Sequence, residues 1–233
     1  MKTLTSIILI LFLSFLSSPS WSETLTMDDL VKRNGLYYEK FTNVPFTGEI
    51  SGIESGKIKN GKKNGEWLSY YENGQLKWIE NYKDGLEDGL VEKYGSDGQL
   101  KGKGNYKDGE VVGFWEWFHN GQLESKGNYK DGLEDGLWEL YWENGQLESK
   151  GNYKDGEKDG LWEYYYENGQ LKSKETFKDG EMDGLVEYYY ENGQLISKGN
   201  FKDGKPEGFF EVFNEDGSVN SEKTGTYKNG VRQ

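Results

Sequence analysis

The sequence lacks cysteine and has little histidine or proline. Its 233 residues include no Cys, one His and three Pro. Without Cys the chain can form no disulfide and no thiolate metal site, and it has no cysteine nucleophile. If the protein works outside the cytoplasm, its stability must therefore come from packing and from local hairpins.

Hydrophobic residues are also scarce. They make up 33% of the chain, whereas roughly 45–50% of the residues in ordinary globular domains are apolar. A thick core is not expected from this composition. Aromatic residues reach 15%, and each large ring removes roughly 150–250 Å² from water. The totals favour a thin structure covered by rings over a globule.

Residues 1–22 have the order of a secretory signal peptide. Lys2 precedes an apolar run from Ile7 to Leu16, and the small residues Ser20 and Ser22 flank Trp21. The apolar run is about half of the ~20 residues that a membrane-spanning helix needs. We therefore predict cleavage after Ser22 and a mature protein in the periplasm or outside the cell. A retained anchor is the alternative.

The formal net charge is −13. An acidic surface repels nucleic acid and anionic lipid, and it attracts basic partners. We therefore expect no nucleic-acid binding and no membrane binding. Solubility of a thin protein would by itself explain the same sign of charge.

The most informative feature is an internal repeat. Glycines preceded by Asn or Asp recur at intervals of 24 residues, with one interval of 23. These pairs are Asn73-Gly74, Asp97-Gly98, Asn120-Gly121, Asn144-Gly145, Asn168-Gly169, Asn192-Gly193 and Asp216-Gly217. A second series of Lys-Asp-Gly turns alternates with them, so each repeat contains two turns and two strand-length pieces. Each unit is predicted to be a β-hairpin.

The turns also predict which residues face each other. A two-residue Asn-Gly turn needs positive φ at both positions, which Asn and Gly tolerate. The pairs expected across Asn144-Gly145 are Trp142–Leu147, Leu140–Ser149, Glu139–Lys150 and Trp138–Gly151, with the Trp138 ring covering the glycine. A tight turn at Asp155-Gly156 would place Ser149 opposite Trp162.

The same rule places opposite charges across the hairpins. It predicts the pairs Glu163–Lys174, Glu187–Lys198 and Glu92–Lys103 on one side of the ribbon, with rings and Leu on the other. The segment from Trp115 to Gly121 is one residue shorter than its counterparts. A local kink or a tighter turn is expected there.

These patterns predict an all-β fold: an elongated single-layer antiparallel meander of tandem ~24-residue β-hairpin repeats with a short N-terminal cap. A short helix is predicted from Met27 to Arg33. The expected divisions are a signal peptide (1–22), an N-terminal cap with an imperfect first repeat (23–64), six hairpin repeats (65–207) and a degenerate C-terminal capping repeat (208–233).

The repeated motif resembles a known family. Residues 136–147 read Gly-x-Trp-x-x-Tyr-x-x-Asn-Gly-x-Leu, and a Lys-Asp-Gly turn follows at 154–156. This pattern is similar to the bacterial variant of the MORN repeat and more closely resembles the YwqK-type antitoxin proteins. The resemblance covers Leu36 to Gly230, including the entry segment 44–48. It implies an elongated antiparallel sheet and the neutralisation of a toxin by binding.

The sequence shows no catalytic pattern. His119 is the only imidazole and lies beside a turn, and no Ser stands in a Gly-x-Ser-x-Gly elbow. A carboxylate recurs once per repeat, at Glu116, Glu139, Glu163, Glu187 and Glu211, but most of these have a Lys expected opposite. We expect a non-enzymatic protein without cofactor or metal.

A row of rings is the candidate binding face. Its members are Trp115, Trp117, Trp138, Trp142, Trp162, Tyr166 and Tyr190, and the turns that space them are Asn73, Gly74, Asn144, Gly145, Asn168, Gly169, Asn192 and Gly193. The first hypothesis is an exported scaffold that binds a partner protein, with a basic toxin as a candidate. The alternative is a cell-envelope module that binds glycan through this face.

Overall fold

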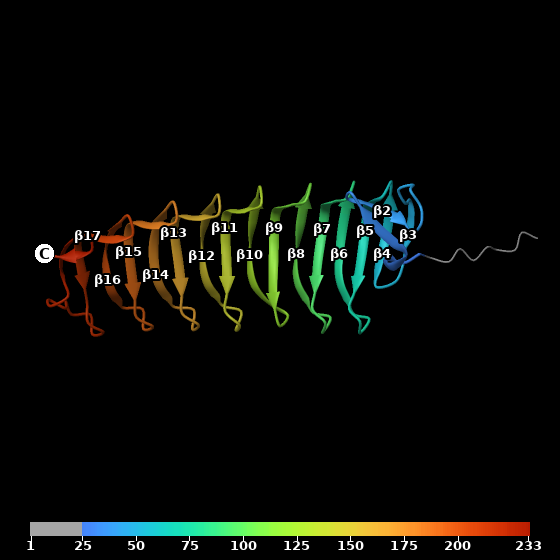
Figure 1. Ribbon diagram of the computed structural model, residues 1–233. Helices are drawn as coiled ribbons and strands as arrows, with labels where there is room; N and C mark the ends of the chain where they lie inside the picture. Colours follow the sequence, from blue (N-terminus) through green and yellow to red (C-terminus); the bar gives the residue numbers. More distant parts are fainter. Residues whose placement is uncertain (1–24) are drawn as a thin grey trace, which may run out of the picture.

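The computed structural model describes residues 25–233. The predicted signal peptide and its cleavage site lie outside the described residues. The described chain forms one elongated row of hairpins that runs from a small N-terminal cap to the C-terminus (Figure 1).

The described chain is almost entirely β-structure. A 3-10 turn, η1 (Met27–Asp29), precedes the cap hairpin of β1 (Leu30–Arg33) and β2 (Leu36–Glu39). The long sheet contains β3 (Gly48–Ile50), β4 (Glu54–Lys59), β5 (Lys62–Tyr70), β6 (Leu76–Lys83), β7 (Leu86–Tyr94), β8 (Leu100–Lys107), β9 (Glu110–His119), β10 (Gln122–Lys130), β11 (Leu133–Tyr141), β12 (Leu147–Lys154), β13 (Glu157–Tyr165), β14 (Leu171–Lys178), β15 (Glu181–Tyr189), β16 (Leu195–Lys202), β17 (Lys205–Val212), β18 (Gly225–Lys228) and β19 (Val231–Arg232).

Each strand from β3 to β19 pairs antiparallel with its neighbour in sequence, which confirms the predicted meander. The predicted helix from Met27 to Arg33 is wrong. Asn34 and Gly35 both have positive φ and form a tight turn, so Leu30–Arg33 pairs with Leu36–Glu39 as a hairpin. Leu30 then packs with Ile50, Ile58 and Trp67 in the small core of the cap.

The Asp-Gly turns have the predicted two-residue geometry. Asp155 and Gly156 have φ of 51° and 83°, and Lys154 pairs with Glu157 across them. The short segment behaves in the same way: Asn120 and Gly121 have φ of 48° and 78°. The tighter turn expected at this point is confirmed.

The other Asn-Gly turns lie where they were predicted, but they are wider than expected. Only the glycine has positive φ, at Gly74 (81°), Gly145 (81°), Gly169 (83°) and Gly193 (84°). The Asn side chain instead accepts a hydrogen bond from the backbone two residues later, as Asn144 Oδ1 does from Gln146 N at 2.9 Å. Asn73, Asn168 and Asn192 make the same bond at 2.9–3.0 Å.

The wider turn shifts the register at the strand ends. Glu139–Lys150, Leu140–Ser149 and Trp138–Gly151 pair as predicted. Trp142 does not lie opposite Leu147, because Tyr141 takes that position after a bulge. Trp142 lies instead in the turn, where its backbone N–H donates to the carbonyl of Gln146 at 2.8 Å.

A second irregularity, between β12 and β13, corrects two further expectations. Asn152 pairs with Asp159, whereas Lys150 pairs with Glu163, so β13 has two extra residues at this point. An even number of extra residues keeps each side chain on its face but moves it along the partner strand. Ser149 therefore faces Tyr164 rather than Trp162.

The bulge brings Trp162 over Gly151. A Cβ at Gly151 would lie only 2.3 Å from Trp162 Cδ2, and a Cβ at Gly127 would lie 2.2 Å from Trp138 Cδ2. The predicted placement of the Trp138 ring over Gly151 is therefore wrong: each ring covers the glycine of the strand before it. The Trp162 indole N–H donates to the carbonyl of Asn152 at 3.0 Å and so satisfies a backbone acceptor beside the bulge.

The tryptophans are buried although the sheet is a single layer. Beyond the bulges, the hairpin ends with the Asp-Gly turns bend out of the plane of the strands (Figure 1). Trp162 packs edge-on against Tyr153 at 5.0 Å between ring centroids, and Trp138 packs against Tyr129 at 5.2 Å. The inside of this bend is the protein's core, and it extends along the sheet one ring per repeat.

At this contact, the covering residue and the residue that it covers change together from one repeat to another. Trp67, Trp115, Trp138, Trp162 and Phe210 lie over Gly56, Gly104, Gly127, Gly151 and Gly199, respectively. In the two remaining repeats the glycine is replaced by Glu80 and Glu175, and the facing residues are Val91 and Val186. A ring is thus found only where the residue that it faces on the preceding strand has no Cβ.

The opposite face of the sheet, here called the outer face, has the predicted rows of charge. Glu163 and Lys174 are register partners, with their charged groups 3.8 Å apart. The shorter ion pair of Glu163 is made with Lys150 of the preceding strand, at 2.9 Å. This hydrogen bond lowers the pKa of the Glu163 carboxyl below its usual value.

The other predicted charge pairs show the same preference. Glu187–Lys198 and Glu92–Lys103 are register partners. The ammonium groups nevertheless bond to the following strand, Lys198 to Glu211 at 2.9 Å and Lys103 to Glu116 at 2.8 Å. The ion pairs therefore connect one hairpin to the next.

The ends of the sheet depart from the repeat. Beyond β17 the chain forms an isolated bridge between Phe213 and Val219 and then the short strands β18 and β19. Gly230 N still donates to the carbonyl of Pro206 at 3.0 Å, as the Asp-Gly turns do in the complete repeats.

We predict that Gly151→Ala destabilises the protein by about 1–3 kcal/mol, because the new methyl group must displace a buried indole. Combining it with Trp162→Val places a residue that has a Cβ opposite Val, as in the native pair of Glu175 and Val186. The double variant should then be more stable than the sum of the single effects implies, by about 0.5–3 kcal/mol. Urea unfolding of the four proteins measures this coupling, and strict additivity would contradict the contact.

The ion pairs predict a pH dependence. The pKa values of Glu139 and Glu163 are lowered in the folded state, chiefly by hydrogen bonds from Lys126 and Lys150. Their stabilisation is therefore present above the unfolded carboxyl pKa of about 4.3 and is lost as the pH falls through the lower folded values.

Replacing Lys126 and Lys150 with Met should lower the free energy of unfolding at neutral pH by roughly 0.2–1 kcal/mol per pair. The variant should then lose less stability than the native chain between about pH 7 and pH 3. Lys130→Met, which removes an exposed lysine that forms no ion pair within residues 25–233, is the control. Equal acid sensitivity of all three proteins would refute the assignment.

Candidate binding surfaces

The seven rings of the predicted binding face do not share one exposed surface. Trp115, Trp138 and Trp162 are buried inside the bend, where no partner can touch them without opening the hairpins. Trp117 is half-buried and stacks on Trp115, with 5.1 Å between ring centroids. These four side chains belong to the core of the sheet.

The other three rings, Trp142, Tyr166 and Tyr190, lie at the edge that carries the wide Asn-Gly turns. Trp142 Nε1–H donates to the carbonyl of Tyr165 at 3.2 Å, and Tyr166 Oη–H donates to that of Tyr189 at 2.8 Å. Tyr190 makes the equivalent bond to Phe213 at 3.4 Å. Each ring is half-buried and holds the turn of the next repeat in place.

Sequence reasoning missed a row of exposed apolar side chains on the outer face. The row contains Leu90, Phe114, Leu137, Leu161, Leu185 and Phe209, which are 45–57% exposed. Each directly follows the glycine at the bend and precedes the buried Trp, Val or Phe. The Gly-Leu or Gly-Phe pair before each buried residue was the available signal, but alternation alone does not tell which side of a one-layer sheet is covered.

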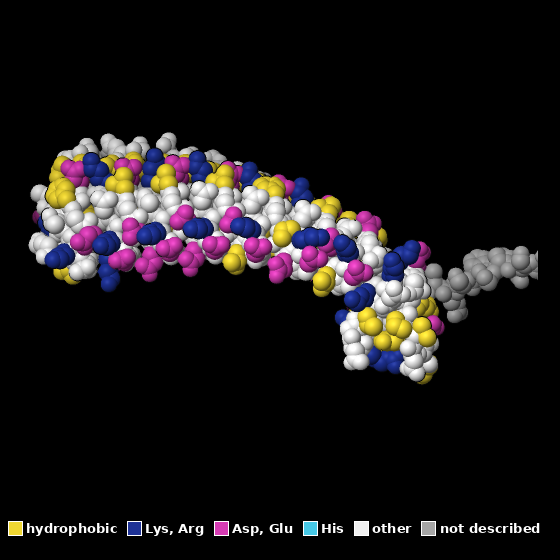
Figure 2. Space-filling view, turned by 90° about the horizontal axis from the view of Figure 1, so that it is seen from above, with side chains coloured by type: hydrophobic (Ala, Val, Ile, Leu, Met, Phe, Trp, Pro, Cys, Tyr) yellow, Lys and Arg dark blue, Asp and Glu magenta, His cyan; other side chains and the backbone are white. Residues whose placement is uncertain are grey.

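This apolar row has polar neighbours on every side. The register partners of Leu137 and Leu161 are Asn152 and Thr176, so apolar and polar side chains alternate along the row. The ion-paired Glu139 lies two residues from Leu137 on the same face. Figure 2 shows hydrophobic side chains at regular intervals between charged ones along the rod. With strands about 4.8 Å apart, neighbouring row members are separated by roughly 10 Å.

The row is held on a stiff support. Neighbouring hairpins are connected by the strand ladders, by the ion pairs and by a hydrogen bond at the Asp-Gly edge, as from Gly156 N to Glu134 O at 3.0 Å. At the opposite edge, Asn144 Nδ2 donates to the carbonyl of Glu167 at 2.8 Å. The spacing of the row is therefore fixed by contacts at both edges.

Two pockets lie at the Asn-Gly edge, on either side of the Trp142 turn. One, of about 370 Å³, is lined by His119, Asn120, Gln122, Leu123, Glu124, Tyr141, Trp142 and Glu143. The other, of about 420 Å³, is lined by Trp142, Tyr165, Tyr166, Glu167, Asn168, Lys172 and Glu191. His119 lies at an exposed turn, as predicted, and forms part of the wall of the first pocket.

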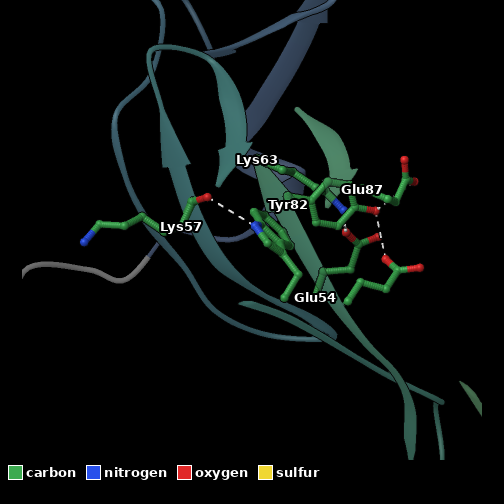
Figure 3. A network of polar contacts seen from close by, with 7 residues as sticks. Glu54, Lys57, Lys63, Tyr82 and Glu87 are labelled. Carbon is green, nitrogen blue, oxygen red and sulfur yellow. Dashed lines mark hydrogen bonds and ion pairs between the residues drawn. The ribbon is translucent and has the colours of Figure 1, made fainter. Parts of the chain in front are cut away.

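A polar network lies inside the bend near the N-terminal end (Figure 3). Tyr82 Oη–H donates to Glu80 at 2.8 Å and lies 3.4 Å from Glu87, while Lys63 pairs with Glu54 at 3.0 Å. Burial, followed by the hydrogen bond to Glu80, raises the pKa of the Tyr82 phenol. The phenol therefore keeps its proton and acts as a donor that binds the carboxylates.

The equivalent lysine later in the chain is held by rings. Lys158 Nζ lies 4.3 Å from the centroid of the Trp162 ring and donates to Tyr164 Oη at 2.6 Å. Burial lowers the pKa of Lys158. Lys63 and Lys158 both fill space inside the bend, so packing accounts for their burial.

Among residues 25–233, no three His, Asp or Glu side chains are arranged to hold a metal ion. In the same part of the chain, no helix has the length and apolar character needed to cross a bilayer.

Comparison with known proteins identifies the repeat. The family described as MORN repeat variant matches residues 63–84, 87–108, 116–131, 134–155, 158–179 and 182–203. A search of curated protein sequences finds no match. The matched segments each span most of one hairpin repeat and together cover more than half of the chain, so the protein belongs to the MORN repeat variant family and is a β-sheet repeat scaffold.

Proposed function

We propose that this repeat scaffold is exported and binds another protein through the apolar row of its outer face. The observation that carries the proposal is the row itself, from Leu90 to Phe209. Its members are about half exposed, and only a second layer packed on the outer face could bury them. Repeated apolar side chains on a rigid surface are typical of interaction sites. Export is supported by the order of residues 1–22.

The surroundings of the row favour a protein over a lipid or a nucleic acid. Asn152, Thr176 and their counterparts offer amide and hydroxyl groups between the apolar side chains, as the polar parts of protein interfaces do. The flanking Glu and Lys side chains are paired with each other, so they leave little net charge beside the row. The overall charge of −13 disfavours anionic surfaces and attracts basic proteins.

Antitoxin-like neutralisation is the specific form of this proposal. The resemblance to the YwqK-type proteins supports it, and the acidic charge suits a basic toxin. In this form the scaffold would cover a functional surface of the toxin and would itself perform no chemistry. Glycan binding through the edge rings Trp142, Tyr166 and Tyr190 is the competing outcome.

The test is affinity purification of the mature chain, residues 23–233, from the envelope and medium of its native cells. We expect a specific protein to be retained by the native chain and lost by the double variant Leu137→Glu/Leu161→Glu. The control is Leu86→Glu/Leu133→Glu, which adds the same charge at side chains of similar exposure that immediately follow Asp-Gly turns.

Retention by the native chain and the control, with loss by the row variant, supports the proposal. Equal retention by all three chains would remove the role of the row. Recovery of cell-wall polysaccharide without a protein, abolished by Trp142→Ala, would overturn protein binding in favour of the glycan module.

A further inference from the structure

We propose that the pocket between the short repeat and Trp142 binds a cationic side chain, Lys or Arg, of the partner protein. That the cation belongs to a protein rests on the proposed protein-binding function. That the pocket takes a cation follows from comparison with the neighbouring repeats.

The pocket lies between Trp142 and the repeat that is one residue short. Tyr71, Trp142, Tyr166 and Tyr190 each place a ring at the Asn-Gly edge and bond to the backbone of the next repeat. In the short repeat the tight turn at Asn120-Gly121 puts the exposed His119 at this edge instead. The row of rings is interrupted there, and one side of Trp142 borders a pocket of about 370 Å³.

Two other repeats show which side chain lies beside a ring at the Asn-Gly edge. The ammonium group of Lys77 lies 5.5 Å from the centroid of the Tyr71 ring, and that of Lys172 lies 5.8 Å from the Tyr166 ring. In both repeats the lysine stands six residues after the ring. Both distances fall within the range in which a cation is attracted to an aromatic ring.

At Trp142 the corresponding residue is Glu148 instead of a lysine. The hairpins have the same geometry, because Tyr70–Leu76, Tyr141–Leu147 and Tyr165–Leu171 pair after the same bulge. Within residues 25–233 no Lys or Arg lies over the Trp142 ring. The chain thus supplies a cation to the rings of Tyr71 and Tyr166, whereas the repeat of Trp142 has no lysine at the corresponding position.

The lining of the pocket is complementary to a positive charge. It combines the Trp142 ring with the carboxylates of Glu124 and Glu143, and it contains no Lys or Arg. The second ring of the lining, Tyr141, already has Lys126 Nζ at 5.3 Å from its centroid, so Trp142 is the ring that an added cation would contact. Neither Glu124 nor Glu143 forms an ion pair in the described part of the chain. By contrast, the neighbouring pocket beside Tyr166 contains Lys172.

The ring is also fixed in advance. The bond from Trp142 Nε1 to the Tyr165 carbonyl and the hydrogen bond from Tyr141 Oη to Glu139 at 2.6 Å hold both aromatic walls. A pre-organised aromatic wall beside unpaired carboxylates favours a cation that still carries apolar groups, such as the stem of Lys or Arg.

The test is an NMR titration of the isolated mature chain, observing the indole N–H signal of Trp142. The probes are N-acetyl-arginine amide and N-acetyl-lysine amide at constant ionic strength. We expect saturable shifts of this signal. The uncharged 3,3-dimethyl-1-butanol, which has a similar apolar bulk, should give none. Tetramethylammonium distinguishes a side chain from a free quaternary ammonium ligand.

The decisive variant is Glu148→Lys, which restores the arrangement of Tyr71 with Lys77 and should abolish the saturable shift. Ile196→Lys is the matched control, because it places a lysine six residues after Tyr190 and leaves the Trp142 pocket unchanged. Unaltered thermal melting of both variants would show that they fold.

Saturation with the arginine and lysine probes, lost in Glu148→Lys and kept in Ile196→Lys, supports the proposal. The proposal would be overturned if no probe gave saturation or if the neutral probe gave an equal response. It would also be overturned if only tetramethylammonium bound or if Glu148→Lys bound the probes unchanged. No partner is used in this titration, so its failure is separate from a failure to capture a protein through the apolar row.

Discussion

The close packing of an aromatic ring on a glycine in the preceding strand is the contact on which the structure depends. Trp162 lies against Gly151 so closely that even a methyl group would collide with the indole. The ring can reach this position because the bulge moves it along the strand, and its N–H then satisfies a backbone carbonyl. A one-layer sheet thereby obtains a buried core that it could not form if it were flat.

This contact is repeated along the chain with two informative exceptions. Where Glu80 and Glu175 replace the glycine, Val91 and Val186 replace the ring and remain buried. Every hairpin therefore contacts only its neighbours, and stability accumulates repeat by repeat, as in other linear repeat proteins. The outer face is free of this packing requirement. Its rows can then differ in exposure and charge without disturbing the fold.

Much of the fold could be predicted from local turn chemistry. Glycines after Asp or Asn at regular intervals are sufficient to predict hairpins, and their spacing predicted the tighter turn at Asn120-Gly121. The bulges could not be predicted, because two extra residues leave the alternation of side chains unchanged. The error in assigning the ring over Gly151 follows from this. The covariation of Gly with Trp and of Glu with Val was present in the sequence and would have corrected it.

The binding surfaces were less accessible to sequence reasoning. Rings such as Trp115 and Trp142 have similar chemistry, but one is buried in the bend and the other lies beside a turn. Only the bend distinguishes them. The exposed Leu137 and the edge pocket likewise depend on which side the hairpin ends fold towards, and no local pattern specifies that direction.

The measurement that bears most directly on the bent, ring-filled sheet is hydrogen exchange of the indole N–H groups, followed by NMR. The indoles of Trp115, Trp138 and Trp162 donate to backbone carbonyls inside the bend and should exchange far more slowly than that of the half-buried Trp117. Equally rapid exchange of all four would contradict the arrangement.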